Sequence, residues 1–164
     1  MDALADRDDR ELRFSLVESF GSQIGDAMGW PPMAGRAAGV LMLSDSPLTM
    51  AQLQDALDAS KGSVSETTRL LIDNGVIERF KGLGQRQYVY RWRHDAWVGC
   101  LEHQLRATAQ LLDFAESVRV QGQKLPRTQR QRVEQMGEYY RFMTDRLQGL
   151  LEDYTRIAGA DGEE

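Results

Sequence analysis

Apolar residues near the start of the chain recur at every fourth position. The series is Leu12, Leu16, Phe20, Ile24 and Met28. Residues four apart lie on the same face of an α-helix, so the series predicts an amphipathic helix from Glu11 to about Gly29. Residues 1–10 are mostly charged, and we expect them to form a flexible N-terminus. Trp30 and the two prolines after it predict a rigid elbow, which ends this N-terminal dimerisation segment, 11–32.

The next elements are shorter and predict the start of a helix-turn-helix. Residues 33–43 predict a helix rich in alanine and glycine, which a neighbouring helix can approach closely. Thr49 and Gln52 have the spacing of a capping box, in which each side chain binds the other residue's backbone N–H. A helix is therefore predicted from Met50. Its expected buried side chains are Leu53, Ala56 and Leu57.

A polar helix follows a break at Ser60. We expect it to run from Lys61 to Asn74, because Asn-Gly is a common helix stop. Its buried face should consist of three residues spaced four and three apart: Val64, Thr68 and Leu71. Its other side carries short polar groups and cations, which suit contacts with DNA bases and phosphates.

Two runs rich in β-forming residues come next. Residues 76–80 and 87–92 predict a hairpin, and the link between them holds two glycines and two cations. A basic hairpin directly after a polar helix is typical of a wing. Residues 33–93 therefore predict a winged helix-turn-helix DNA-binding domain, and the fold class is mainly α with a small β-hairpin.

Residues 94–158 predict two long amphipathic helices. Asp95 is expected to cap the first, and the second, over about 127–157, alternates apolar spacings of three and four in coiled-coil fashion. The expected buried face of the first helix is Trp97, Leu101, Leu105, Thr108, Leu112 and Ala115. The stripe of the second is Val133, Met136, Tyr140, Met143, Leu147, Leu150, Tyr154 and Ile157. Residues 159–164 are expected to form a flexible tail.

These long helices carry more apolar surface than one winged module can cover. We therefore expect a homodimer, in which the N-terminal helix and the two C-terminal helices of each copy interlock around a two-fold axis. No stretch of eighteen apolar residues occurs, and the acidic N-terminus differs from a signal peptide. With Cys100 as its one cysteine, the chain is expected to be cytoplasmic and without internal disulfides.

Charge is distributed unevenly along the chain. The formal net charge is −5, which alone argues against nucleic acid as a partner. Between Ser60 and Arg93, however, seven cations stand against three acids. A basic region on an acidic body is attracted to phosphate while the body is repelled. The candidate DNA-binding residues are Lys61, Ser63, Ser65, Glu66, Thr67, Arg69, Lys81 and Arg86. The cations among them suit phosphates or the minor groove, and the others suit base edges.

Several runs resemble the MarR superfamily of winged-helix transcription regulators and, within it, the GbsR-like branch. These runs are residues 28–36, 60–65, 75–77 and 84–90. The resemblance implies a dimer with each recognition helix in a major groove, and release by a small-molecule effector. The expected function is that of a sequence-specific transcription regulator, a repressor, which binds a pseudo-palindromic operator with half-sites about 10 bp apart. The alternative is a winged-helix module that binds another protein and no DNA.

Other sets of residues suggest further chemistry. The candidate effector-binding residues are Trp30, Trp92, Trp97, Tyr139 and Tyr140, because aromatic rings can enclose a cationic ligand. Aromatic residues at helical spacing are more often part of a core. Cys100 and His103 match no zinc-binding pattern, so no metal or cofactor is expected. Cys100 would sense oxidants only with an exposed thiol of lowered pKa. No catalytic arrangement occurs, so the chain is not expected to be an enzyme.

Overall fold

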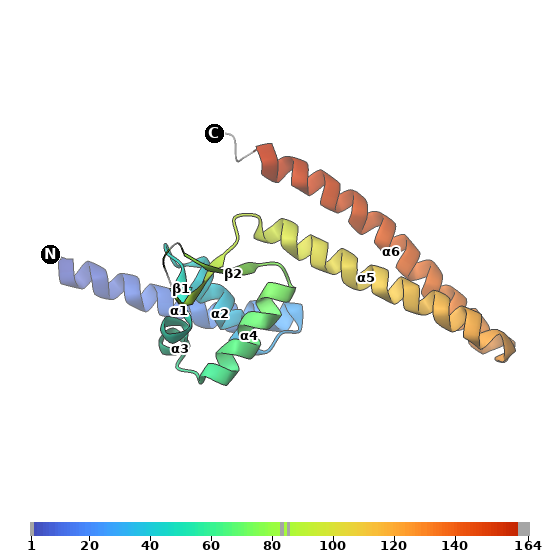
Figure 1. The fold of residues 1–164 in the computed structure, drawn as a ribbon, viewed down its shortest axis with the longest axis horizontal. Coiled ribbons are helices and arrows are strands. Elements are labelled where there is room, and N and C mark those ends of the chain that lie inside the picture. Colours follow the sequence, from blue (N-terminus) through green and yellow to red (C-terminus); the bar gives the residue numbers. More distant parts are fainter. Residues whose placement is uncertain (1, 83, 85, 161–164) are drawn as a thin grey trace. The chain divides into compact units, whose positions relative to one another are not determined.

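The computed structural model describes residues 2–82, 84 and 86–160, which form two compact units, Met1–Ala96 and Trp97–Glu164. The first unit contains four helices and a small sheet, and the second begins within a long helix and contains another (Figure 1). The elements are α1 (Asp2–Met28), α2 (Pro32–Met42), β1 (Leu48–Thr49), α3 (Met50–Leu57), α4 (Lys61–Asp73), β2 (Ile77–Lys81), β3 (Tyr88–Trp92), α5 (Ala96–Gln121), the 3-10 turn η1 (Gly122–Lys124) and α6 (Arg127–Ala160). The mainly helical fold class with a β-hairpin is confirmed.

Helices α1 and α2 pack at a distance that only glycine allows. A Cβ atom on Gly35 would lie 2.5 Å from the backbone oxygen of Phe20 and 2.9 Å from the Cα of Gly21. A Cβ atom on Gly39 would lie 2.9 Å from the Cβ of Phe20. The close approach predicted for the helix over residues 33–43 is therefore present, and α1 is the helix that approaches it. Val17 of α1 is buried. Leu12 and Phe14, nearer the start of α1, are exposed.

Helix α1 is longer than the sequence pattern indicated. It begins at Asp2 rather than at Glu11, so residues 2–10 of the predicted flexible N-terminus are helical. Arg13 and Asp9 form an ion pair one turn apart, with 2.9 Å between Nε and Oδ2. Such pairs, and acidic residues near a helix N-terminus, stabilise helices without any apolar stripe.

The helix-turn-helix forms as its caps predict. Both bonds of the capping box are present, from Gln52 N–H to the Thr49 hydroxyl (3.2 Å) and from Thr49 N–H to the Gln52 side chain (2.8 Å). The predicted core residues of α3 and α4 are buried, namely Leu53, Leu57, Val64, Thr68 and Leu71. Ala56 is exposed, contrary to the prediction. The short α3 buries only the narrow face on which Leu53 and Leu57 lie.

The wing belongs to a three-stranded antiparallel sheet in the order β1-β3-β2. Lys81 pairs with Tyr88 and Arg79 with Tyr90 across the predicted hairpin. Residue 83 and residue 85 of the predicted link lie outside the described residues, and Gly84 has a φ of 76°. Strand β1 was not predicted, because two residues are too short to show alternation. It pairs Leu48 with Tyr90 and thereby attaches the start of α3 to the sheet.

The second unit consists of α5 and α6 joined by η1. Glu116 of α5 accepts hydrogen bonds from Arg119 (2.8 Å) and from Arg141 of α6 (2.7 Å). These bonds hold the pKa of the Glu116 carboxyl below its usual value, Arg119 contributing most. Helix α6 extends to Ala160, so the predicted tail is helical at residues 159–160, and residues 161–164 lie outside the described residues.

Much of the predicted apolar face of this second unit is not covered. Ala115 and Leu147 are buried, but Leu150 and Ile157 are exposed. Trp97 was predicted to be buried and is 50% exposed. Asp95, predicted to cap α5, directly precedes this helix, and its carboxylate accepts two hydrogen bonds from Arg93, of 2.8 and 2.7 Å. This pairing lowers the pKa of Asp95. Among the described residues, no helix has the length and apolar content needed to cross a bilayer.

The glycine contact between α1 and α2 leads to a stability prediction. Gly35→Ala should lower the free energy of unfolding by about 1–3 kcal/mol, since a methyl group must displace backbone rather than a flexible side chain. Gly25→Ala on α1 is the matched control, because its Cβ would meet the Trp30 oxygen at 3.4 Å, an ordinary contact. Urea unfolding followed by circular dichroism measures both. Equal stability of the two variants would contradict close packing at Gly35.

Candidate nucleic-acid interface

A groove lies between α3, α4 and the wing in the first unit. Its volume is about 510 Å³. Its lining residues are Met50, Ala51 and Gln54 of α3, Lys61 and Ser65 of α4, and Arg79, Arg86, Gln87, Tyr88 and Tyr90 of the wing. We call it the α4–wing groove. It contains three of the predicted DNA-binding residues: Lys61, Ser65 and Arg86.

The N-terminus of α4 is fixed by its cap. The Ser60 hydroxyl accepts the Ser63 N–H at 3.3 Å, so Ser60 is the N-cap. Lys61, Glu66 and Arg69 are exposed along the helix, and Ser65 is half-buried at the groove. The Arg69 Nε lies 3.4 Å from the Ser65 carbonyl oxygen. The exposed side of α4 thus presents two cations, a carboxylate and small polar groups.

Thr67 is not part of that exposed side. It is only 7% exposed. Successive residues of a helix turn by about 100°, so Thr67 lies within about 60° of Val64 and Leu71, which are fully buried. The prediction that Thr67 lies on the exposed polar side of the helix is therefore wrong. Ser63 lies on the same flank and does not line the α4–wing groove, whereas Ser65 lines it and Glu66 is exposed, so Ser65 and Glu66 are the better placed base-edge candidates.

The wing carries its cations on aromatic rings. The Arg79 guanidinium carbon lies 4.1 Å from the centre of the Tyr88 ring, and the Lys81 Nζ lies 4.8 Å from it. Each such contact contributes on the order of 0.5–1 kcal/mol at an exposed site. Tyr88 itself is 44% exposed. The ring therefore orients two cations. A carboxylate in its place would neutralise their charge, whereas the ring does not.

Glu78, the carboxylate on the strands of the wing, is paired with an arginine. Glu78 binds Arg91, with 2.7 Å between Oε1 and Nε, and Arg91 also lies 4.5 Å from the Phe80 ring centre. Glu78 and Arg91 thus balance each other, and Lys61, Arg79 and Arg86 line the groove without a carboxylate among its lining residues. The arrangement suits a polyanion.

Sequence reasoning missed seven of the ten groove residues: Met50, Ala51, Gln54, Arg79, Gln87, Tyr88 and Tyr90. The sequence contained a signal for those that lie on the hairpin strands. Side chains alternate along a strand, and directly paired residues share a face, so Arg79, Lys81, Tyr88 and Tyr90 were bound to lie together once the hairpin register was known. No sequence pattern indicates that Gln54 of α3 borders the same groove, because this depends on how the helices pack.

The five candidate effector residues are divided between the units. Trp30 and Trp92 belong to the first unit, and Trp97, Tyr139 and Tyr140 to the second. The two tyrosine rings meet edge to face, with 5.1 Å between their centres, but Tyr139 is exposed and Tyr140 half-buried. A shared aromatic cage stays a prediction. Among the described residues, no three His, Cys, Asp or Glu side chains are grouped as metal ligands.

Comparisons with known proteins agree with this geometry. The family profile of MmpR5-like MarR family transcriptional regulators matches residues 95–156. The chain is 32% identical over 148 residues to the HTH-type transcriptional regulator MmpR5 of Mycobacterium tuberculosis, a match that covers 89% of this chain and 88% of that protein. It is 30% identical over 80 residues to the HTH-type transcriptional repressor OpcR of Bacillus subtilis, covering 49% of this chain and 43% of that protein.

A solved structure has the same fold. The crystal structure of a transcriptional regulator matches with a TM-score of 0.81 and 28% sequence identity, and the match covers 88% of this chain and 98% of that chain. The similarity thus includes both the helix-turn-helix and the long C-terminal helices.

Burial raises the pKa of the Cys100 thiol, which lowers its thiolate content at neutral pH. Because the thiolate is the reactive form, iodoacetamide should alkylate Cys100 several-fold more slowly in the folded protein than in urea at pH 7.5. The gap should narrow as the pH rises toward the raised pKa. Mass spectrometry measures the single modification. A folded rate at or above the unfolded rate would instead indicate an activated, oxidant-sensitive thiol.

Proposed function

The chain belongs to the MarR family of winged-helix transcription regulators, and we propose that it acts as a homodimeric repressor on a pseudo-palindromic operator. It is a DNA-binding transcription regulator, as the family is, and that family consists of regulators rather than enzymes. The name of OpcR, a transcriptional repressor, supports repression as the sign of control. Each α4 would enter a major groove, with half-sites about 10 bp apart.

The observation that carries the proposal is the basic α4–wing groove on an acidic chain. Lys61, Arg79 and Arg86 line it, while the whole chain has a net charge of −5. We assign phosphate or minor-groove contacts to these three residues and to Arg69 and Lys81. Contacts with base edges are assigned to Ser65 and Glu66, with Ser63 at the margin.

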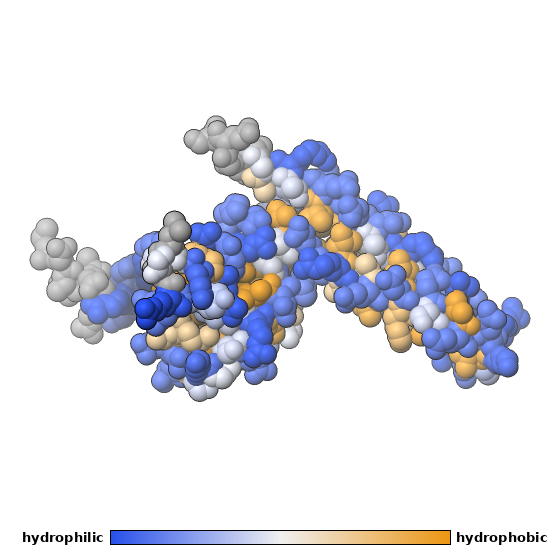
Figure 2. Space-filling model, in the orientation of Figure 1, coloured by the Kyte–Doolittle hydropathy of each residue, from blue (hydrophilic) through white to orange (hydrophobic). Residues whose placement is uncertain are grey.

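Homodimerisation is supported by an uncovered face of α6. Four large apolar residues of this helix are each more than half exposed, namely Tyr139, Phe142, Leu150 and Ile157. At about 100° per residue they fall within a sector of about 80°, beside the sector that contains the buried Leu147. Orange side chains recur along the second unit on the side drawn in Figure 2. A second copy of the chain would remove this apolar stripe from water.

The charges of this face are compatible with self-association. Arg146 and Asp153 lie in the same sector as the exposed apolar residues. In an antiparallel pair of α6 helices with the two-fold axis midway between these positions, each arginine would lie opposite an aspartate of the other copy. Phe142 would then lie opposite Ile157. Such a contact is self-complementary, as a two-fold interface requires.

The GbsR-like branch is part of the proposal, supported by the runs at residues 28–36 and 60–65. Release by a small-molecule effector is an expectation from the same resemblance. The alternative, a winged-helix module that binds protein and no DNA, is disfavoured by family membership. Selection of fragments from the source genome with the purified protein, read by sequencing, tests the function directly. Absence of enriched sequences at moderate salt would contradict it.

Arg86 provides a test of the wing. Arg86→Ala should weaken binding to all DNA sequences and reduce the slope of log affinity against log salt by about 0.9, the value for one lost phosphate contact. Fluorescence anisotropy with a labelled duplex at several salt concentrations measures both. Arg132→Ala, the same charge change at an exposed position of α6, should leave the slope unchanged. Equal slopes for both variants would remove Arg86 from the interface.

Leu150 provides a test of the dimer. Leu150→Glu should convert the protein to a monomer in sedimentation velocity. It should also lower operator affinity about 100-fold or more, because the two DNA-binding units are then no longer linked and each binds its half-site independently. Thr155→Glu adds the same charge to an exposed position on the opposite side of α6, and this variant should remain dimeric. A wild-type protein that sediments as a monomer at micromolar concentration would overturn the dimer.

A further inference from the structure

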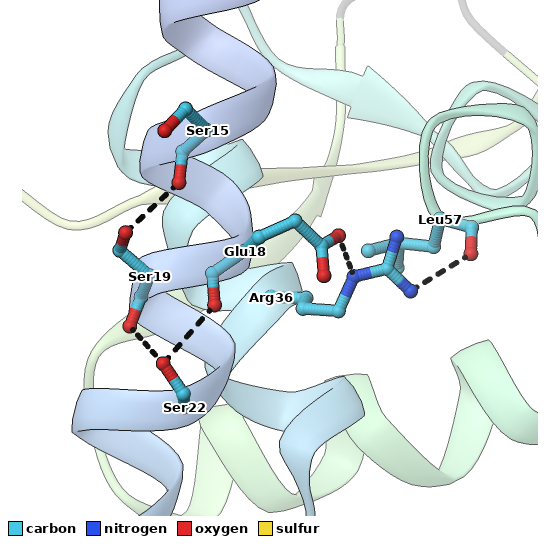
Figure 3. Close-up of polar contacts among 6 residues, drawn as sticks. All are labelled: Ser15, Glu18, Ser19, Ser22, Arg36 and Leu57. Carbon is cyan, nitrogen blue, oxygen red and sulfur yellow. Dashed lines mark hydrogen bonds and ion pairs between the residues drawn. The ribbon is translucent and has the colours of Figure 1, made fainter.

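Arg36 joins three helices of the first unit through one side chain. Its Nε donates to Glu18 Oε1 of α1 at 2.8 Å, and its Nη1 donates to the backbone oxygen of Leu57 of α3 at 3.3 Å. Figure 3 shows the guanidinium of Arg36 between these two acceptors. The Arg36 side chain is 23% exposed, against 47% for Glu18. A partly buried, charged hydrogen-bond network of this kind is costly to break at one end.

The surroundings of Arg36 are shaped to fit this side chain. A Cβ atom on Gly21 of α1 would lie 2.6 Å from the Arg36 Cγ, so glycine at this position leaves the path of the side chain open. Among the residues labelled in Figure 3, the serines of α1 bond to carbonyls of their own helix: Ser19 Oγ donates to the Ser15 oxygen at 2.9 Å, and Ser22 Oγ to that of Ser19 at 3.2 Å. Glu18 is the member of this α1 group that reaches another helix.

The acceptor on α3 stands directly before the recognition helix. Leu57 is the last residue of α3, where backbone carbonyls lack partners within the helix and favour a cation. Asp58 then adopts a left-handed conformation with φ 48°, and Ser60 caps α4. The whole turn between the two helices is therefore three residues long, so the position of the Leu57 carbonyl strongly constrains the start of α4.

We propose that Arg36 is a positioning residue for operator recognition, which fixes the orientation of α4 relative to α1. The inference rests on the proposed function, in which α4 reads the DNA, and on the expectation from the sequence that α1 belongs to the dimerisation region. If α1 is held by the two-fold axis, the Glu18–Arg36–Leu57 linkage sets the distance between the two recognition helices. Arg36 thereby enforces the half-site spacing without contacting DNA.

Variants of Arg36 separate this role from simple stabilisation. Arg36→Met keeps much of the aliphatic stem and removes both hydrogen bonds, whereas Arg36→Lys keeps the charge and one bond at most. The matched control is Arg13→Met. Arg13 also joins α1 to a helix end, donating at 2.9 Å to the backbone oxygen of Leu43, the C-cap of α2, but that end does not lead into α4.

The experiment uses full-length dimeric protein and duplexes selected with the wild-type protein. For each protein, affinity is measured by anisotropy on the selected duplex and on versions with one or two base pairs inserted between the half-sites. Wild type and Arg13→Met should bind the selected spacing at least about tenfold more tightly than the altered ones, as distortion of a rigid dimer requires. Arg36→Met should lose about tenfold on the selected spacing and bind all spacings within about threefold. Arg36→Lys should be intermediate.

The outcomes distinguish failure of the positioning role of Arg36 from failure of the proposed DNA-binding function. Retention of the wild-type spacing preference by Arg36→Met, with the dimer and helical content intact, overturns the positioning role. If Arg36→Met unfolds, the folded Arg36→Lys variant decides, and an unchanged spacing preference there likewise overturns it. A wild-type protein that binds no DNA fails the proposed function instead. Loss of affinity with an unchanged spacing preference assigns Arg36 a stabilising role only.

Discussion

The close approach of α1 to α2 is the constraint on which the rest of the first unit depends. At Gly35 the two backbones stand so near that a single methyl group would overlap the Phe20 carbonyl oxygen. Contacts of this kind bring many atoms of both helices within dispersion range, and they do not allow one helix to slide past the other without a clash. The N-terminal helix is therefore a structural part of the helix-turn-helix unit and not an appendage. Any rotation imposed on α1 must be passed to α2, and from there to α3 and α4.

The placement of individual cations on the first unit is a second constraint. The chain as a whole is acidic, so attraction to DNA depends on the placement of a few cations rather than on total charge. Tyr88 orients Arg79 and Lys81 by ring contacts that leave their charge available. Arg91, by contrast, is paired with Glu78. The wing thus contains two cations that lie over an aromatic ring and one cation that is paired with a carboxylate, and the sequence alone does not distinguish the two kinds.

The sequence predicted the elements well because their ends depend on local chemistry. The Thr49 capping box, the Asn-Gly stop and the elbow before α2 each involve residues within a few positions of one another, and each is confirmed. The errors have non-local causes. Thr67 was taken as exposed because it is polar, but burial depends on the angle at which α4 packs. Trp97 was predicted to be buried because it lies on an apolar stripe. Such a stripe indicates that some packing partner exists, but it does not show that the partner lies within the same chain. The α4–wing groove needs three elements to meet, so its residues from α3 could not be inferred from spacing.

Affinity and specificity are assigned to different parts of this molecule. The base-edge candidates on α4 are few and short, since Thr67 is buried and Ser63 is half-buried beside the cap. Ser65 and Glu66 offer limited direct readout, and each well-formed base contact contributes only about 1–3 kcal/mol of discrimination. In the proposed interface the cations of the wing would bind phosphate, which adds affinity without adding sequence information. A regulator built in this way gains selectivity if the distance between its two recognition helices is fixed, because only operators with matching half-sites can then engage both. The stiffness of the α1–α2 contact and the linkage through Arg36 are the features of the first unit that would provide such a fixed distance.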